Sequence, residues 1–492
     1  MRIGAALSRA PLGGNYPAAV AIALLALSPF IVLTTAAALL QHSVIADLHT
    51  TRFGYELSSG LANGAYAFGA VVAADLIQRL PGRRLYVGCE ALFVVGSLLG
   101  ALSFDVYVFN VARAMQGLAT GMLLVAALPP LITQHGPEKL PGTAAVVNLG
   151  LFGMVTLGPV VGGLANDLHW WRELYGAVAV LGLAGLALGL LGFEGNDPPG
   201  RGMGFDWFAI PLAFGATIVP FVGVSWLSEG AFSSPEFIAP LAAGVAMVIA
   251  LVVIQYRKRR PLMPVRIIAH TLPVVGVLGA MVVGAAFTTL LELLELYLLM
   301  VVHHPPAVVG FLLAGQIAGV ALAAWLFKRA LPTKWTPYLA LSGMAATAVG
   351  AAVLLWLSPG AADAIAGAVA FLLGYGAGAG VTPGLFMAGL SVPSTKLGPT
   401  FALVELLRSE AAFMVGPVLL ALAMAAGSLA AGVQLGVVIM LVFDGALGVA
   451  LVGLYLIGGA TPHPPDLDRW LQGESSAYHS PAIAARVRDD VD

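Results

Sequence analysis

The stretch YPAAVAIALLALSPFIVLTTAAALLQ, residues 16–41, decides the fold because it contains no charged side chain. About 20 consecutive apolar residues are enough to span the hydrocarbon core of a bilayer as a helix. The stretch is longer than the apolar core of a signal peptide, and no convincing cleavage site follows it. We therefore expect it to be retained as a first transmembrane helix.

Thirteen further apolar segments follow along the chain. They lie near residues 56–78, 84–104, 107–133, 142–165, 174–193, 207–227, 236–256, 272–300, 306–328, 335–357, 362–390, 398–426 and 430–458. The sequence is 59% hydrophobic and only 10% charged, and its mean hydropathy is +0.93. A soluble chain could not hide so much apolar surface from water. The sequence therefore predicts an all-α polytopic membrane protein with 14 transmembrane helices.

The positive charges of the loops alternate between the two sides of this arrangement. One side carries Arg2, Arg9, Arg79, Arg83, Arg84, Lys139, Arg201, Arg257, Lys258, Arg259, Arg260, Arg266, Lys328, Arg329, Lys334, Lys396, Arg469, Arg486 and Arg488. The other side carries only Arg52 and Arg172, whereas Arg113 and Arg408 lie inside segments. Because cytoplasmic loops are rich in Lys and Arg, we expect a cell (inner) membrane protein with both termini in the cytoplasm.

Composition and motifs exclude several classes of function. The net charge is −2, and no basic cluster is interleaved with aromatic residues, so nucleic acid is not an expected partner. The single cysteine, Cys89, allows no intrachain disulfide. No metal-ligand spacing, phosphate loop, catalytic triad or redox motif is present. We therefore expect neither an enzyme nor a cofactor. The cluster RKRRP at 257–261 is interpreted as a topology anchor that can also contact anionic lipid.

Two polar regions and a weak internal repeat suggest the domain organisation. The loops RLPGR (79–83) and ALPTK (330–334) each place a cation two residues after a proline. If they are equivalent, the chain contains two parallel six-helix repeats, as in alternating-access transporters. The predicted parts are a cytoplasmic N-terminus (1–15), an N-terminal six-helix bundle (16–193), a cytoplasmic linker (194–206), an inserted helix pair (207–256), a basic cytoplasmic loop (257–271), a C-terminal six-helix bundle (272–458) and a cytoplasmic, mostly disordered tail (459–492).

Several motifs resemble those of the major facilitator superfamily and its fourteen-helix drug:proton antiporters. The resembling stretches are ARAMQGLATG (112–121), GMVTLGPVVGG (153–163), WWRELY (170–175), FDW (205–207), RRPLMPVRI (259–267), GYGAGAGVTP (374–383) and LLRSEAAFMVG (406–416). The second of these is the most specific. The resemblance implies roles in conformational change for Arg79, Arg83, Arg84, Gln116, Gly117, Gly158, Pro159, Gly162 and Gly163.

The sequence also departs from the pattern of that group. The first helix usually carries an acid, but VLTTAAALLQH (32–42) has Leu33 at that place and His42 where a proline is usual. In the loop IQRLPGRR (77–84), the aspartate that is usual in the group is either replaced by Gln78 or displaced to Asp75. The acids around Arg408 are not expected from the group pattern. The proton-coupling site of the group therefore cannot be copied onto this chain.

Charged residues inside segments are the candidate functional residues. Each costs roughly 2.5–3.5 kcal/mol at a helix centre, so it needs a partner or a wet cavity. Glu292 and Glu295 share one helix face, and the resemblance implies that their helix and that of Arg113 line one cavity. We expect Arg113 and a glutamate to pair across this cavity in proton coupling; the alternative is an ion pair that only closes the outer side. Glu405 and Arg408 form either a structural pair or a second coupling site.

These observations predict a secondary active transporter that exports small amphiphilic or hydrophobic compounds in exchange for protons. One alternative is a facilitator or symporter of a small metabolite or lipid, which the missing acid of the first helix keeps open. Another is a transport-inactive membrane sensor or scaffold. The expected partners are membrane lipid, a small-molecule substrate and protons, and we expect a monomer. The inserted helices carry no intramembrane charge, so we expect them to lie outside the central cavity.

Overall fold

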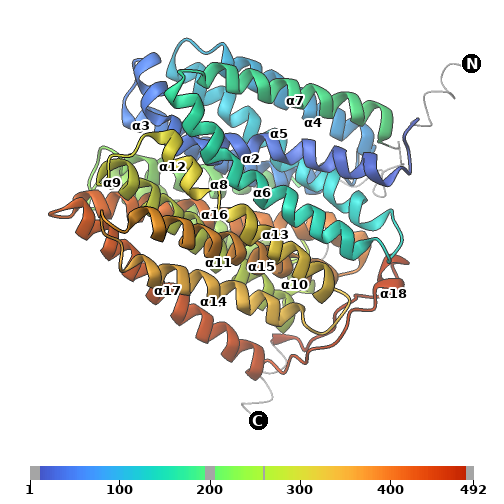
Figure 1. Ribbon diagram of the computed structural model, residues 1–492. Coiled ribbons are helices and arrows are strands. Elements are labelled where there is room, and N and C mark those ends of the chain that lie inside the picture. Colours follow the sequence, from blue (N-terminus) through green and yellow to red (C-terminus); the bar gives the residue numbers. More distant parts are fainter. Residues whose placement is uncertain (1–10, 194–205, 259–260, 484–492) are drawn as a thin grey trace, which may run out of the picture.

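The computed structural model describes residues 11–193, 206–258 and 261–483. Within these residues 14 helices are long and apolar enough to cross a membrane, which confirms the predicted fold class. Their successive directions alternate (Figure 1). The helices are α2 (Tyr16–Asp47), α3 (Arg52–Leu76), α4 (Gly82–Ala101), α5 (Val106–Thr133), α6 (Leu140–Asp167), α7 (Trp171–Gly192), α8 (Ala209–Trp226), α9 (Pro235–Arg257), α11 (Thr271–Met300), α12 (Pro306–Leu313) and α13 (Gln316–Ala330), which together make the tenth span, α14 (Thr336–Leu354), α15 (Ala362–Leu390), α16 (Leu397–Ala425) and α17 (Leu429–Ile457).

Short polar residues start several of these helices. The side chain of Asn15 accepts a hydrogen bond from the backbone N–H of Ala18, and Thr51, Asp105 and Ser428 cap α3, α5 and α17 in the same way. Such caps satisfy backbone N–H groups that have no partner within the helix. They fix where each apolar segment begins, which the hydropathy pattern alone leaves open by several residues.

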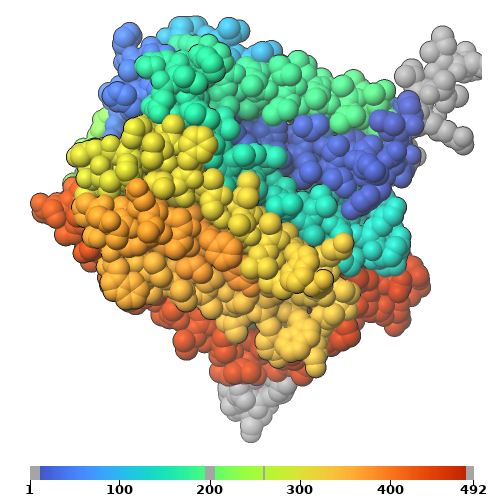
Figure 2. Space-filling view, viewed as in Figure 1, coloured from blue at the N-terminus to red at the C-terminus, as the bar shows by residue number. Residues whose placement is uncertain are grey.

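The helices form two bundles that pack side by side. The N-terminal bundle contains α2 to α7 and the C-terminal bundle contains α11 to α17; Figure 2 shows them as a blue-to-green upper block and a yellow-to-red lower block. We call the side that carries Tyr16 and the loops after α3, α5, α13 and α15 the basic face, and the other side the opposite face. On the basic face α16 packs against α5, where Gly398 lies next to Val125 and Pro129. The bundles are therefore in contact on that side.

The inserted pair, α8 and α9, packs against the N-terminal bundle. Gly60 and Gly64 of α3 lie against Phe221 and Thr217 of α8, so the two backbones approach closely. The second helix of the pair, α9, is mostly exposed, as expected for a helix that faces lipid. Most of the predicted 194–206 linker lies outside the described residues.

The C-terminal tail is ordered where it is described, so the prediction of disorder is wrong for residues 461–483. A short helix, α18 (Leu467–Leu471), carries Trp470, which is fully buried and donates its indole N–H to the carbonyl of Val392 at 2.7 Å. The backbone N–H groups of Ala477 and Tyr478 both donate to the carbonyl of Leu390. Burial raises the pKa of Tyr478 to about 12. Two buried aromatic residues and these hydrogen bonds thus hold a tail whose composition is polar.

Candidate functional site

A cavity of about 210 Å³ lies between the two bundles in the half of the molecule near the opposite face. Five helices line it: α2 and α3 from the first bundle, α11 and α16 from the second, and the inserted helix α8. From α8 and the residues after it come Phe221, Val224, Ser225, Leu227 and Ser228. The expectation that both inserted helices lie outside the central cavity is therefore wrong for α8. The small residues of α3 bring α8 close enough to complete the wall.

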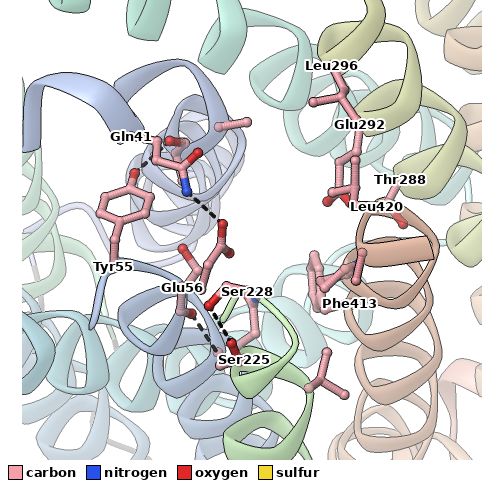
Figure 3. A pocket seen from close by; sticks show the side chains of 18 of the residues that line it. Gln41, Tyr55, Glu56, Ser225, Ser228, Thr288, Glu292, Leu296, Phe413 and Leu420 are labelled. Atoms are coloured by element: carbon pink, nitrogen blue, oxygen red, sulfur yellow. Dashed lines mark hydrogen bonds between the residues drawn. The ribbon is translucent and has the colours of Figure 1, made fainter. Parts of the chain in front are cut away.

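Three carboxylates face this cavity, namely Glu56, Glu292 and Glu295. Figure 3 shows Glu56 on one side of the opening and Glu292 on the other. The amide of Gln41 donates to Oε1 of Glu56 at 2.8 Å, and Arg52 lies one turn before Glu56 on α3. Oε2 of Glu292 and Oε1 of Glu295 are buried and have no hydrogen-bond partner among the described residues. A buried carboxylate without such a partner is costly unless it takes up a proton.

The rest of the cavity wall is amphiphilic. Hydroxyl and amide groups come from Thr34, Thr35, Ser59, Asn63, Ser225 and Thr288, and aromatic rings come from Phe221, Phe287 and Phe413. A mostly apolar wall with a few polar groups is typical of sites for small organic molecules. A compound with an apolar body and a polar group fits this chemistry.

Below the cavity, toward the basic face, a hydrogen bond links α3 of the first bundle to α16 of the second. The hydroxyl of Tyr66 on α3 donates to Oε1 of Glu405 on α16 at 2.8 Å. Arg408 pairs with the same carboxylate through Nη2 and donates to Oε2 from Nε at 3.1 Å. The expected pairing of Glu405 with Arg408 is therefore present. Tyr66, Glu405 and Arg408 together form a polar cluster below the cavity. The sequence analysis did not identify Tyr66 as part of it.

Arg113 does not face the cavity. It is 1% exposed within the N-terminal bundle, with its guanidinium 5.6 Å from the centre of the Phe30 ring. Its Nη1 donates to Oε1 of Gln116 at 3.0 Å, and Gln116 in turn donates to Ser97. Arg113 forms no ion pair among the described residues. The predicted pair between Arg113 and Glu292 or Glu295 is therefore wrong for this conformation, because the guanidinium contacts Phe30 and Gln116 of its own bundle instead.

The glycines and the proline of the helix 153–163 motif lie at two helix contacts. A Cβ at Gly158 or Gly162 would meet Thr35 or Ala36 of α2. A Cβ at Gly163 would meet the backbone of Pro306 on α12, and one at Gly310 would meet the backbone of Pro159. Small residues let helix backbones approach closely in membranes. The motif therefore forms part of the contact between the bundles near the opposite face.

The arginines of the 77–84 loop lie on the basic face, away from the cavity. Nη2 of Arg79 is 2.7 Å from Oδ1 of Asp75, so the two residues form an ion pair at the end of α3. Nη2 of Arg83 donates to the carbonyl of Leu190 at the end of α7. Arg84 is exposed.

On α5, a Cβ at Gly117 would meet the backbone of Ala62, so this glycine sets the distance between α5 and α3.

Sequence reasoning missed Glu56 as a site residue. The apolar segment begins at residue 56, so the glutamate looks like the polar start of a helix in water. The helix in fact begins at Arg52, capped by Thr51, which places Glu56 one turn inside. The signal was present in the sequence, because TTRFGYE contains a capping threonine followed by an acid that hydropathy alone assigns to the surface.

The comparisons with known proteins agree with this architecture. The family model for the Major Facilitator Superfamily matches residues 18–417. The chain is 24% identical over 317 residues to an uncharacterized MFS-type transporter of Bacillus subtilis, covering 63% of this chain and 62% of that protein. It is 26% identical over 298 residues to a multidrug resistance protein B homolog of Mycobacterium tuberculosis, covering 59% and 54%. These matches span less than two thirds of the length of either relative.

A longer match and a solved structure extend the comparison. The drug efflux pump JefA of Mycobacterium tuberculosis is 27% identical over 380 residues, covering 75% of this chain and 72% of that protein. A crystal structure of the peptide transporter POT in complex with sulfate superposes with a TM-score of 0.63 at 17% identity, covering 93% of this chain and 98% of that one. This structural likeness concerns the fold alone. The chain belongs to the major facilitator superfamily.

Proposed function

We propose that this protein is a secondary active transporter that exports small amphiphilic compounds in exchange for protons. The observation that carries the proposal is the cavity between the bundles, where Glu292 and Glu295 present buried carboxyl oxygens without hydrogen-bond partners among the described residues. A carboxylate in such a place is costly unless it takes up a proton or binds a cation. Glu56 faces the same space and is the third group of the proposed coupling site.

In this proposal, acids of α3 and α11 that line the cavity take the role of the acid that is missing from the first helix. Leu33 stands where the group usually has its acid and is 1% exposed in the apolar core. Gln41, two turns further along the same helix, instead holds Glu56 of α3 by a hydrogen bond of 2.8 Å. In our proposal α2 thus contributes to coupling through an amide that positions a carboxylate, and the carboxylates of α3 and α11 carry the protons.

We also propose that the basic face lies in the cytoplasm, because loops rich in Lys and Arg remain on that side. A cysteine in place of the exposed Arg266 should then be protected from an impermeant thiol reagent in intact cells. A cysteine in place of Gly360, in an exposed loop of the opposite face, should react. Cys89 is buried and is replaced by Ser in both variants. The reverse pattern of labelling would overturn the orientation.

Transport is tested in vesicles that contain the purified protein and a pH-sensitive dye. Ethidium, puromycin and tetraphenylphosphonium serve as probes, and proton movement is followed when each is added. We expect at least one probe to be concentrated by an imposed proton gradient and to move protons in return. Glu292→Gln, Glu295→Gln and Glu56→Gln should each weaken this exchange, and the triple variant should abolish it. Glu173→Gln is the matched control, because Glu173 is exposed on α7.

The outcomes also separate the rival functions. Downhill movement of a probe that ignores the proton gradient would indicate a facilitator. Movement of a probe and protons in the same direction would indicate a symporter. A triple variant that still concentrates a probe at normal expression would show that the protons travel elsewhere, and the Glu405–Arg408 pair would be examined next.

A further inference from the structure

A second cavity of about 190 Å³ lies on the flank of the C-terminal bundle, outside the proposed transport site. It is a groove between α11, α14, α15 and α17, and its walls are apolar apart from the hydroxyls of Tyr338 and Tyr455. In Figure 1 the helices α14 and α17 lie along the lower edge of the molecule, away from the N-terminal bundle. The groove therefore faces the lipid that surrounds a membrane-spanning chain.

Glycines hollow out the groove. Gly276, Gly279, Gly380 and Gly448 line it and contribute no side chain. A Cβ at Gly279 would find only Leu451 and Met344, both at 4.0 Å, so there is unfilled space in front of this residue. Leu341 and Leu456 at the rim are 44% and 69% exposed. A narrow apolar groove of this kind fits a hydrocarbon chain.

The end of the groove at the basic face is polar. It is formed by the start of α14, at Pro337 and Tyr338, and by the end of α17, at Tyr455 and Leu456. The hydroxyl of Tyr455 is buried and has no hydrogen-bond partner among the described residues. The rings of Trp335 and Tyr338 lie 5.3 Å apart, both half-exposed, as in the aromatic belt at a membrane surface.

Positive charge lies at the same end. Lys334 is exposed two residues before α14 begins, and the N-terminal end of a helix carries a partial positive charge. Among the described residues, most of the Lys and Arg residues in loops and at helix ends lie on this face. A negatively charged headgroup is therefore favoured here over a neutral one.

We propose that this groove binds an anionic phospholipid of the leaflet at the basic face. One acyl chain fills the space in front of Gly279, the hydroxyl of Tyr455 donates to an ester oxygen, and the phosphate lies beside Lys334 at the start of α14. The site is formed within one bundle and does not depend on the function proposed above.

The test uses the full-length protein purified in detergent, with phosphatidylglycerol and phosphatidylcholine as probes and native mass spectrometry as the readout. For the wild type we expect phosphatidylglycerol to be retained at least several-fold better than phosphatidylcholine. Gly279→Leu fills the groove and should remove most of the retained lipid. Gly445→Leu is the matched control, because Gly445 is exposed on α17 with open space around it. Lys334→Gln should lower the preference for phosphatidylglycerol while a chain is still bound.

A second measurement does not depend on the variants folding. Phosphatidylglycerol with a photoreactive group in its acyl chain is cross-linked to the wild type, and the labelled peptides are identified. Labelling should concentrate in residues 272–279 and 448–456. Equal retention of the two lipids, unchanged retention by Gly279→Leu, or labelling spread evenly over all lipid-facing helices would each overturn the proposal. Displacement of the lipid by ethidium would identify the groove as a substrate site instead and would equally overturn it.

Discussion

The hydroxyl of Tyr66 on α3 and the carboxylate of Glu405 on α16 are joined by a hydrogen bond of 2.8 Å that crosses from one bundle to the other. Tyr66 lies about one helical turn below Asn63 in the cavity wall, and Glu405 about two turns below Phe413. The bond thus lies between the cavity and the basic face. An alternating-access transporter must break such a contact each time the cavity opens on the other side.

Tyr66→Phe should therefore shift the protein toward the state that is open at the basic face. Hydrogen bonds to charged groups are worth about 1.5–3 kcal/mol, which corresponds to a change of roughly tenfold or more in the balance of states. Glu405 keeps its partner Arg408, so folding should be preserved. The measurement is the labelling rate of a cysteine at the fully buried position of Ala402 on α16, in a background without Cys89.

The matched control is Tyr375→Phe, because Tyr375 is hydrogen-bonded to Ser342 within the C-terminal bundle, between α15 and α14. It should leave the labelling rate unchanged. Equal rates for Tyr66→Phe and the wild type would show that the bond does not hold the basic face closed.

Arg113 and Glu292 should act independently, because they share no partner in the structure. Arg113→Ala should lower the melting temperature, since it leaves Gln116 without its guanidinium partner and a hole beside Phe30. Glu292→Gln should change coupled transport with little effect on folding. In a double-mutant cycle the two effects on stability should add to within about 0.5 kcal/mol. A larger interaction energy would indicate that the two residues pair in another conformation.

Gly163→Ala should impair the contact between α6 and α12. Its new Cβ would meet the backbone of Pro306, which cannot move aside as a flexible side chain can. We expect a lower melting temperature and slower transport. Gly142→Ala, on the same helix with open space around it, should behave like the wild type or be slightly more stable, since alanine is the better helix former. Similar losses for both variants would contradict the assigned contact.

Trp470→Ala should release the tail from the basic face. Replacing a large buried aromatic residue by alanine costs about 3–5 kcal/mol, and the bond to the carbonyl of Val392 is lost as well. Limited proteolysis should then cleave within residues 461–483, which we expect to be protected in the wild type. Trp356→Ala is the control, because Trp356 is 72% exposed and should change neither stability nor the cleavage pattern. A tail that is cleaved equally in all three proteins would contradict its packing.

The sequence by itself determined the number of spans, their approximate ends and the alternation of loop charge. These depend on the hydropathy of each segment and on short local motifs, and each can be read without knowing what lies next to it. The pairing of Glu405 with Arg408 also follows from spacing along one helix. Glu292 and Glu295 could also be selected as candidates from the sequence, because a charge inside an apolar helix is costly wherever the helix packs.

Only the tertiary structure decided which helices share a cavity and which charges meet. Arg113 contacts Gln116 of its own helix and Phe30 of α2 rather than a glutamate of the other bundle. The position of Phe30 beside it cannot be read from the helix that carries Arg113. The position of Glu56 in the cavity, the contribution of α8 to its wall and the Tyr66–Glu405 hydrogen bond all depend on contacts between residues far apart in the chain. The tail was predicted to be disordered from its average polarity, but Trp470 and Tyr478 are buried and backbone hydrogen bonds join the tail to Leu390. Packing between distant segments decides such features, because their energies depend on neighbours that hydropathy and local motifs do not specify.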